Sequence, residues 1–343
     1  MTDYSTLERF LHKIALGSPS LSEMFFDLEK LLNRTGFQRT DSVYVTGLAR
    51  AGTTTVMRAL FESAQFASLT YNDMPFVLAP NLWSKVSGFK GKTRHSKERA
   101  HKDGIQVNYD SPESFEEVFW RLHCGDDYIF PASLTVHDVD QQTLNELNIY
   151  HNLICLKNIK HRYLAKNNNT ILRIKSLAQS YKDCTFLVVF RQPFNQSKSL
   201  LQQHMQFTNN DKFTHQYMNW LVHHEFGSTH RPFVFNSPLS QVDQIARLSS
   251  DSRTIEYWLQ RWVDAYGYLL TILENGMPNV MPISYEKICN QPGYWSQLCD
   301  HLNLNAIPYD FNRAQVLGDI DCDHALKLKA LSIYNKLNLL CCY

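Results

Sequence analysis

The chain has 343 residues, 44% hydrophobic and 20% charged, with a formal net charge of +1, so it can bury a large core and offers no basic excess for nucleic acid or an anionic membrane. No apolar run approaches transmembrane length, and residues 1–20 mix charged and apolar side chains, unlike a secretory signal. The eight cysteines include no C-x-x-C pair, so we expect reduced thiols and a cytoplasmic protein.

The first elements along the chain are a helical hairpin, expected over residues 4–36, and a short β-rich run at Val43–Thr46. Gly47 and Gly52 then bracket a tight turn, and three consecutive threonines open a helix with an apolar face. The first amides of a helix lack intrahelical partners and lie at the positive end of its dipole. This strand, turn and helix therefore predict an anion site.

The turn is close to the nucleoside-triphosphatase loop G-x-x-x-x-G-K-[ST], but Thr53 stands where that loop has lysine. Without the lysine, the β and γ phosphates of a triphosphate lose their usual point charge. Arg50, inside the turn, supplies instead a planar cation suited to a sulfonate or phosphate oxygen. The alternative is a turn that merely joins a strand to a helix.

A second strand and helix occupy residues 185–201. A buried strand at Phe186–Phe190 ends at Arg191, Pro193 stops it, and the following helix carries Ser199. In open parallel sheets, ligands lie outside the carboxyl ends of strands, where loops from different strands converge. We therefore expect Arg191 and Ser199 to meet the ligand of the first turn.

Together the two segments resemble the sulfotransferase family that uses 3'-phosphoadenosine 5'-phosphosulfate (PAPS). In that family a basic residue followed by a Ser-Gly-Thr-Thr-like loop holds the 5'-phosphosulfate, and this chain reads Arg50-Ala51-Gly52-Thr53-Thr54. A later strand ending in Arg-Asp-Pro, with a serine eight residues after the arginine, binds the 3'-phosphate there. Residues 283–286, Ile-Ser-Tyr-Glu, match a further family segment. The resemblance covers about residues 41–300, and its arginine-type loop is most like bacterial and tyrosylprotein members.

The resemblance implies an α/β fold with three layers, in which a central, mostly parallel, P-loop-like sheet is flanked by helices and helical acceptor-side insertions. It implies one domain over residues 1–343, with N-terminal helices at 1–40, a cofactor core at 41–65 and 153–205, acceptor-side segments at 66–150 and 206–250, and C-terminal helices with the last strand at 251–343. The residues expected to bind PAPS are Arg50, Ala51, Gly52, Thr53, Thr54, Thr55, Arg191 and Ser199.

Two positions depart from the family pattern. Gln192 replaces the aspartate of Arg-Asp-Pro, and Ala51 replaces the serine of the first loop, so two polar contacts are expected to be missing. The glycine-rich basic loop of small-molecule members has no match after Asp310. Some other group must complete the 3'-phosphate and adenine site.

Sulfuryl transfer moves a group in line between two oxygens, so cations that stabilise the transferring and leaving oxygens matter most. We expect Arg50 to contact the leaving phosphate. Lys166 is expected as a second cation because tyrosylprotein members carry a lysine at a similar distance before the second arginine. An alternative places Lys166 in an Asn-rich turn, with Asn169 or Thr170 capping a helix at residues 171–181.

The acceptor must lose a proton, so a base should lie beside the sulfur. Asp73, after the first helix, and His101, in a charged loop, are the two predicted bases, with His101 equally compatible with a solvated surface histidine. Residues 103–113 offer further carboxylates. A helix is expected to begin with Ser111 as its cap, with Glu113, Glu116 and Glu117 simply stabilising its dipole.

The segment Trp220–His230 contains several histidines, but His224-Glu225 lacks the second histidine at the spacing of a zinc protease helix. We expect no metal here. The segment more plausibly forms an aromatic cover over the acceptor cleft, although core packing explains the same residues. Its ring-bearing neighbours are Phe207, Phe213, Tyr217, Phe226, Phe233 and Phe235.

Four more elements complete the expected fold. A strand is predicted near Leu153–Leu156 and a long helix over 251–275, with an apolar stripe that includes Trp262 and Tyr266. A strand at 279–284 and a helix at 286–302 follow. No repeat or linker divides the chain.

Three functions fit these motifs. The first is sulfuryl transfer from PAPS to a hydroxyl or amine of an acceptor, whether small molecule, lipid, carbohydrate or peptide. The second is a P-loop kinase, disfavoured by Thr53 and by the lack of an evident magnesium ligand. The third is a non-catalytic nucleotide-binding relative. The chain is also compatible with a homodimer.

Overall fold

The computed structural model describes most of the chain, and every structural statement below concerns the described residues alone. They are residues 6–33, 36–87, 97–98, 106–107, 110–209, 211–235, 251–305, 308–311 and 320–341.

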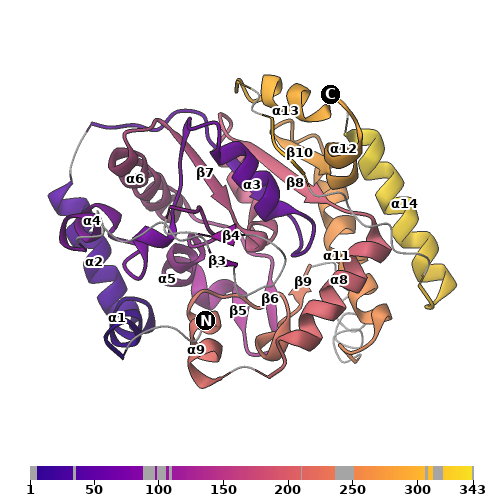
Figure 1. The fold of residues 1–343 in the computed structure, drawn as a ribbon, viewed down its shortest axis with the longest axis horizontal. Coiled ribbons are helices and arrows are strands. Elements are labelled where there is room, and N and C mark those ends of the chain that lie inside the picture. The colour runs from indigo at the N-terminus through magenta and orange to yellow at the C-terminus, as the bar shows by residue number, and fades with distance from the viewer. Residues whose placement is uncertain are drawn as a thin grey trace.

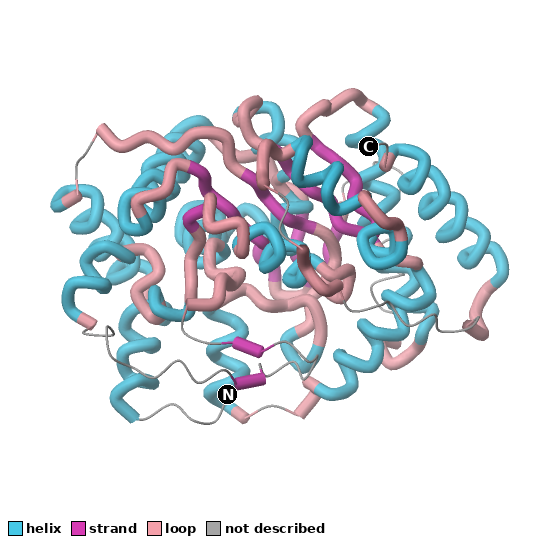
Figure 2. The backbone as a smooth tube through the Cα atoms, turned by 45° about the horizontal axis from the view of Figure 1, so that its top comes forward, coloured by secondary structure: helices cyan, strands magenta, loops and turns pink. Residues whose placement is uncertain are grey.

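A five-stranded parallel sheet forms the centre of the molecule (Figure 1). Its strands are ordered β10 (Val280–Ser284), β8 (Thr185–Phe190), β1 (Val43–Thr46), β7 (Arg162–Lys166) and β2 (Phe66–Ala67), and each neighbouring pair is parallel. Figure 2 shows these strands in the middle of the molecule with helices on both sides. The predicted α/β fold with a flanked parallel sheet is confirmed.

Side chains of successive strand residues enter two separate cores, as the period-2 geometry of a strand requires. On one face, Val45 of β1 and Val189 of β8 pack with α3 (Thr53–Phe61), α12 (Tyr285–Asn290) and α13 (Tyr294–His301). On the other face, Tyr44 and Val188 join a larger core. The helices that contribute to that larger core include α5 (Glu117–Tyr128), α6 (Gln141–Asn158), α7 (Ile174–Ser180), α11 (Ile255–Glu274) and α14 (His324–Leu340). This arrangement gives the three layers.

The remaining elements surround the sheet. α1 (Thr6–Gly17) and α2 (Pro19–Leu32) form the expected N-terminal hairpin, on the side of the molecule opposite α14 (Figure 1). The others are the helices η1 (Tyr71–Asp73), α4 (Pro80–Val86), η3 (Asn168–Leu172), α8 (Pro193–Gln206), α9 (Lys212–Trp220) and η4 (Gly227–Thr229), and the strands β3 (Lys97–Glu98), β4 (Gln106–Val107), β5 (Ile129–Phe130), β6 (Ser133–Thr135) and β9 (Phe233–Val234). No described helix is long and apolar enough to cross a membrane.

Two predicted elements are wrong in type or extent. Residues 153–156 belong to helix α6, and the strand expected there begins later, at Arg162. The run Leu153–Leu156 is apolar but too short to distinguish a strand from a buried helix segment. The helix expected over 286–302 is divided into α12 and α13, because Gly293 adopts a left-handed φ of 87° directly after Pro292.

Helix α5 also begins later than predicted, at Glu117 rather than after Ser111. Glu116 and Glu117 do not stabilise a surface helix terminus, because both are buried and bonded to other side chains. Glu116 Oε2 lies 3.0 Å from Nε2 of His151, and Glu117 Oε1 accepts a 2.8 Å hydrogen bond from Arg173. These contacts hold α5 against α6, through His151, and against the residue between η3 and α7, through Arg173.

Candidate functional site

The carboxyl ends of four parallel strands meet at one edge of the sheet. The glycine-bracketed turn follows β1, Lys166 ends β7, Arg191 follows β8, and Tyr285 follows β10. The chain leads from β1 to β2 on one side of the sheet and from β8 to β10 on the other, so the connections diverge where β1 and β8 lie side by side. Ligands of open parallel sheets bind at such a point.

Backbone geometry in the turn requires its glycines. Gly47 has a φ of 142°, and a Cβ there would lie 2.2 Å from the carbonyl oxygen of Val189. Gly52 has a φ of 97°, and a Cβ there would lie 2.3 Å from the ring of Tyr285. Arg50 itself has a left-handed φ of 68°. A non-glycine residue in this conformation carries strain of the kind that clusters at functional sites.

Helices α8 and α11 hold the turn from outside. Gln196 Nε2 donates a 3.0 Å hydrogen bond to the carbonyl oxygen of Ala49, and Trp262 Nε1 donates to Gln196 Oε1 at 3.0 Å. The hydroxyl of Tyr266 donates to the carbonyl oxygen of Val189 at 2.9 Å and accepts from the amide of Leu48. The apolar stripe predicted for α11 therefore also carries polar groups that fix the turn.

The turn and the second segment contact each other directly. Nε of Arg50 donates a 2.9 Å hydrogen bond to Oγ of Ser199 on α8. The two residues are 149 positions apart in the sequence, and both were predicted to bind the same ligand. The structure thus brings together Arg50 and Ser199, and places them beside the N-terminus of α3.

Arg191 lies at the end of β8 with a buried Nε that has no hydrogen-bond partner among the described residues. The neighbouring Gln192 does not leave a missing contact, as its departure from Arg-Asp-Pro had suggested. Its side-chain oxygen accepts from the amide of Asn195 at 2.8 Å and caps α8. Its own amide donates to Glu286 at 2.9 Å. Gln192 therefore performs the capping role expected of an aspartate at a helix start.

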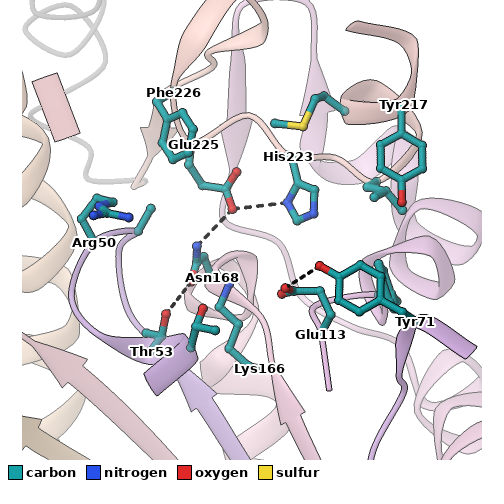
Figure 3. A pocket seen from close by; sticks show the side chains of 15 residues that line it. Arg50, Thr53, Tyr71, Glu113, Lys166, Asn168, Tyr217, His223, Glu225 and Phe226 are labelled. Carbon is teal, nitrogen blue, oxygen red and sulfur yellow. Dashed lines mark hydrogen bonds and ion pairs between the residues drawn. The ribbon is translucent and has the colours of Figure 1, made fainter. Parts of the chain in front are cut away.

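A pocket of roughly 780 Å³, including its open mouth, begins at this turn (Figure 3). One end is formed by the turn, the start of α3 and the end of β7, and the other end by largely apolar and aromatic side chains. The residues that line it are Ala49, Arg50, Thr53, Thr54, Tyr71, Glu113, Phe115, Lys166, Asn168, Tyr217, Met218, Leu221, His223, Glu225 and Phe226. The expected aromatic cover is thus present in part, through Tyr217 and Phe226.

A chain of polar contacts crosses the pocket wall (Figure 3). Thr53 Oγ1 donates to Asn168 Oδ1 at 3.4 Å, and Asn168 Nδ2 donates to Glu225 Oε1 at 3.0 Å. Nδ1 of His223 lies 3.5 Å from the same carboxylate oxygen. Burial raises the pKa of Glu225, but the opposing effects of His223 and Lys166 outweigh it and hold that pKa well below its ordinary value. Glu225 is therefore a carboxylate at neutral pH.

Lys166 is buried, 8% exposed, and lines the pocket. The Asn-rich turn that follows it also caps a helix, but not as predicted: the side chain of Asn167 accepts from the amide of Asn169 at the start of η3. Asn169 and Thr170 instead lie inside η3, and α7 begins only at Ile174, without a side-chain cap. The two interpretations of this segment are compatible, because Asn167 is the cap while Lys166 and Asn168 face the pocket.

Asp73, one of the two predicted bases, is not among the described residues that line the pocket. Asp73 is 1% exposed, caps η1 by accepting from the amide of Thr70 at 2.8 Å, and is ion-paired with Lys157. His101 lies outside the described residues. Of the other predicted PAPS residues, Ala51 is fully buried in the core beneath the turn, and Thr55 interacts with the Tyr285 hydroxyl.

His223, Glu225 and Asn168 are among the pocket residues that sequence reasoning did not select. His223 and Glu225 stood within the segment tested for zinc spacing, and they share a short connection after α9 rather than a helix face. An alternating His-x-Glu in an extended or turn segment places both side chains within reach of each other. The His-x-Glu spacing of His223 and Glu225 was therefore the sequence feature that could have indicated this pair.

A comparison with family models finds no match, and neither does a comparison with curated protein sequences. Among solved structures, sulfotransferase STF1 from Mycobacterium tuberculosis H37Rv aligns with 98% of this chain and 85% of its own, at 10% identity and a TM-score of 0.50. Sulfotransferases STF9 from Mycobacterium avium (13% identity, TM-score 0.43, 94% of this chain and 74% of that one) and from Alicyclobacillus acidocaldarius (11%, 0.43, 88% and 95%) also align. The likeness to STF1 concerns the fold: this chain has the α/β fold of a sulfotransferase.

Proposed function

We propose that the protein transfers a sulfuryl group from PAPS to a hydroxyl or amine of an acceptor bound in the pocket. The observation that carries the proposal is the hydrogen bond between Arg50 and Ser199, because it joins two segments that the sulfotransferase pattern assigns to one nucleotide. The fold shared with STF1 supports the same assignment.

The residues present fit such a ligand. PAPS carries anionic groups at both its 5' and 3' ends, and the site offers an arginine for each. Arg50 lies in the turn at the N-terminus of α3, where unpartnered amides also favour an anion. The Nε of Arg191 is buried and has no hydrogen-bond partner among the described residues, so it can donate to an oxygen of a bound anion. When bound, PAPS would supply the sulfuryl group.

Arg50 and Lys166 are the two cations that can stabilise charge during the transfer of a sulfuryl group between oxygens. Arg50 and Lys166 both line the pocket beside Thr53 and Thr54. Fixed positive charge in a partly water-excluded site stabilises the negative charge that develops on the transferring and leaving oxygens. Because Lys166 is buried at the end of β7, its charge is positioned before any ligand enters.

His223 is the base that this geometry favours over Asp73. Its Nδ1 faces the carboxylate of Glu225, which orients the ring and favours a proton on Nδ1. Nε2 is then the nitrogen able to accept the acceptor's proton. Glu225, ionised at neutral pH, stabilises the imidazolium that results. Glu113, which accepts a 3.1 Å hydrogen bond from Tyr71, is a second carboxylate in the lining.

Sulfuryl transfer from radiolabelled PAPS to a panel of phenols, alcohols, sterols, sugars and tyrosine peptides tests this function. We expect label on at least one acceptor with wild-type protein, and transfer about a hundredfold to a thousandfold slower with Arg50→Ala. Transfer of phosphate from ATP and magnesium, with no sulfuryl transfer, would instead establish the kinase alternative. Tight binding of adenosine 3',5'-bisphosphate without transfer to any acceptor would establish the non-catalytic relative.

A further inference from the structure

A second pocket adjoins the first on the far side of the turn. Ala49 and Glu225 line both pockets, so the two cavities share a wall. The second is formed where the turn meets α8, α11 and residues 230–233. Apolar side chains contribute most of its lining: Leu48, Ala49, Leu200, Pro232, Phe233 and Trp258.

Two guanidinium groups also line this apolar pocket, Arg231 and Arg261. Arg261 is 7% exposed, and its Nη2 donates to Asp264 at 2.9 Å. Its Nε is buried and has no hydrogen-bond acceptor among the described residues. A buried donor of a charged group that lacks an acceptor is unfavourable, so such a group calls for a ligand or another explanation.

Among the described residues, Arg231 supplies a guanidinium charge that has no carboxylate partner, unlike Arg261, which is paired with Asp264. Within the described part of the chain it has no acidic partner, and burial lowers its pKa without an opposing carboxylate. By contrast, Arg253, just before α11, is exposed and ion-paired with Asp251. Arg261 therefore differs from this surface arginine in its burial and its unsatisfied Nε, and Arg231 differs in having no carboxylate partner among the described residues.

The other titratable groups that face this pocket do not cancel its positive charge. Burial lowers the pKa of His230 to about 3, so its ring is neutral at pH 7. Glu225 is the carboxylate in the shared wall, and its charge is already opposed by His223 and Lys166 from the first pocket. Asp264 is the remaining acid, and it accepts a 2.7 Å hydrogen bond from Gln260. Of the two arginines, it pairs with Arg261 and not with Arg231. One guanidinium charge remains in excess.

We propose that the second pocket binds an anionic group on the acceptor, so that the natural acceptor is an apolar molecule with a hydroxyl at one end and a carboxylate, or an equivalent oxyanion, at the other. Arg231 and Arg261 bind the anion, and the apolar lining holds the adjoining part of the molecule. This proposal rests on the proposed function and specifies its substrate class.

Direct binding without nucleotide tests the proposal separately from catalysis. Calorimetric titration with ω-(4-hydroxyphenyl)alkanoic acids of increasing chain length would be compared with their methyl esters and with the matching sulfonates. We expect the carboxylates to bind about tenfold or more tightly than the esters at an optimal length, because a hydrogen bond to a charged group is replaced by one to a neutral group. The sulfonate series shows whether the pocket prefers a planar or a tetrahedral oxyanion.

Three variants locate the preference. Arg231→Gln and Arg261→Gln should each reduce the preference for acid over ester severalfold, while Arg253→Gln, the paired surface control, should leave it unchanged. If Arg261→Gln fails to fold, the acid-over-ester preference of Arg231→Gln alone tests the proposal. Equal affinity of acids and esters for the wild-type protein contradicts the proposal, even if sulfuryl transfer is observed. A preference that depends on these arginines supports it, even if transfer from PAPS fails.

Discussion

Nε of Arg50 donates a 2.9 Å hydrogen bond to Oγ of Ser199, across 149 residues of sequence. Arg50 belongs to the turn after β1, and Ser199 to the helix after β8, and these strands are neighbours in the sheet. The contact therefore joins two distant segments of the chain into a single site. It also holds the guanidinium in place although Arg50 has a left-handed backbone conformation.

Arg50→Ala and Arg191→Ala should impair the enzyme in different ways. Arg50 lines the pocket, so its loss should lower kcat by about a hundredfold to a thousandfold. Arg191 lies outside that lining, with an unpartnered Nε, so its loss should weaken binding of adenosine 3',5'-bisphosphate by about tenfold or more. Steady-state kinetics and calorimetry measure the two effects, and equal losses of both kinds in both variants would argue against these roles.

His223→Asn should lower kcat/KM by about a hundredfold to ten-thousandfold, because it removes the proposed base while keeping a similar volume. His215→Asn on α9 is the matched control, since His215 is exposed and outside the pocket lining. Unchanged kinetics in His223→Asn, with loss in Asp73→Asn, would restore Asp73 as the base.

Asp73→Asn should act on stability rather than on the chemical step. The substitution leaves Lys157 without its buried partner, so we expect a loss of about 2 to 4 kcal/mol in the free energy of unfolding. Urea denaturation measures this loss, and kcat of the folded fraction should remain within a few-fold of wild type. A stable variant with no activity would assign Asp73 to catalysis.

Gly52→Ala should cost far more than a glycine substitution elsewhere at positive φ. Its Cβ would lie 2.3 Å from the Tyr285 ring, whereas Gly276, with a φ of 77°, has nothing within 4 Å of its built Cβ. Gly276→Ala therefore measures the backbone penalty alone, about 1 kcal/mol. Thermal denaturation should show a larger loss for Gly52→Ala, together with weakened nucleotide binding. Equal losses would mean that Tyr285 moves aside freely.

The protein should lose stability in mild acid through its buried histidines. Burial, assisted by the positive charge of Arg173, lowers the pKa of His137 to about 4 from an ordinary 6.5. Between these values the unfolded chain binds a proton that the folded chain does not, so stability falls as pH falls. His137 should contribute about 2 kcal/mol of that loss between pH 7 and pH 5.

His137→Asn isolates this contribution. Its free energy of unfolding, measured in urea at several pH values, should decrease less steeply below pH 6.5 than that of the wild type. The pKa of His224 is lowered in the same sense, to about 4, so part of the slope should persist. An unchanged slope would show that His137 titrates normally in the folded protein.

The sequence predicted most of the fold because its strongest signals are local. The turn after β1 and the strand ending at Arg191 combine apolar runs with glycine, proline and hydroxyl residues, and both formed as expected. Residues 153–156 were predicted incorrectly because a short apolar run fits a helix and a strand equally. The pattern of apolar residues at 153–156 could not show that the segment would pack against the sheet as part of a helix.

The site was less predictable because its remaining groups are brought together only by the fold. Glu116 and Glu117 resembled helix-terminal acids, and nothing local indicated that His151 and Arg173 would bury them. Likewise, Glu225 meets Asn168 across 57 residues. Such contacts depend on how α5, β7 and the segment after α9 pack, which no short window of sequence specifies.

The proposed function requires that the turn at residues 47–52 binds PAPS rather than a nucleoside triphosphate. Calorimetric titration of the wild-type protein with adenosine 3',5'-bisphosphate, and separately with ATP and magnesium, tests it most directly. We predict saturable binding of the bisphosphate that Arg191→Ala and Ser199→Ala weaken, with no comparable binding of ATP. Tighter binding of ATP and magnesium than of the bisphosphate would contradict the account.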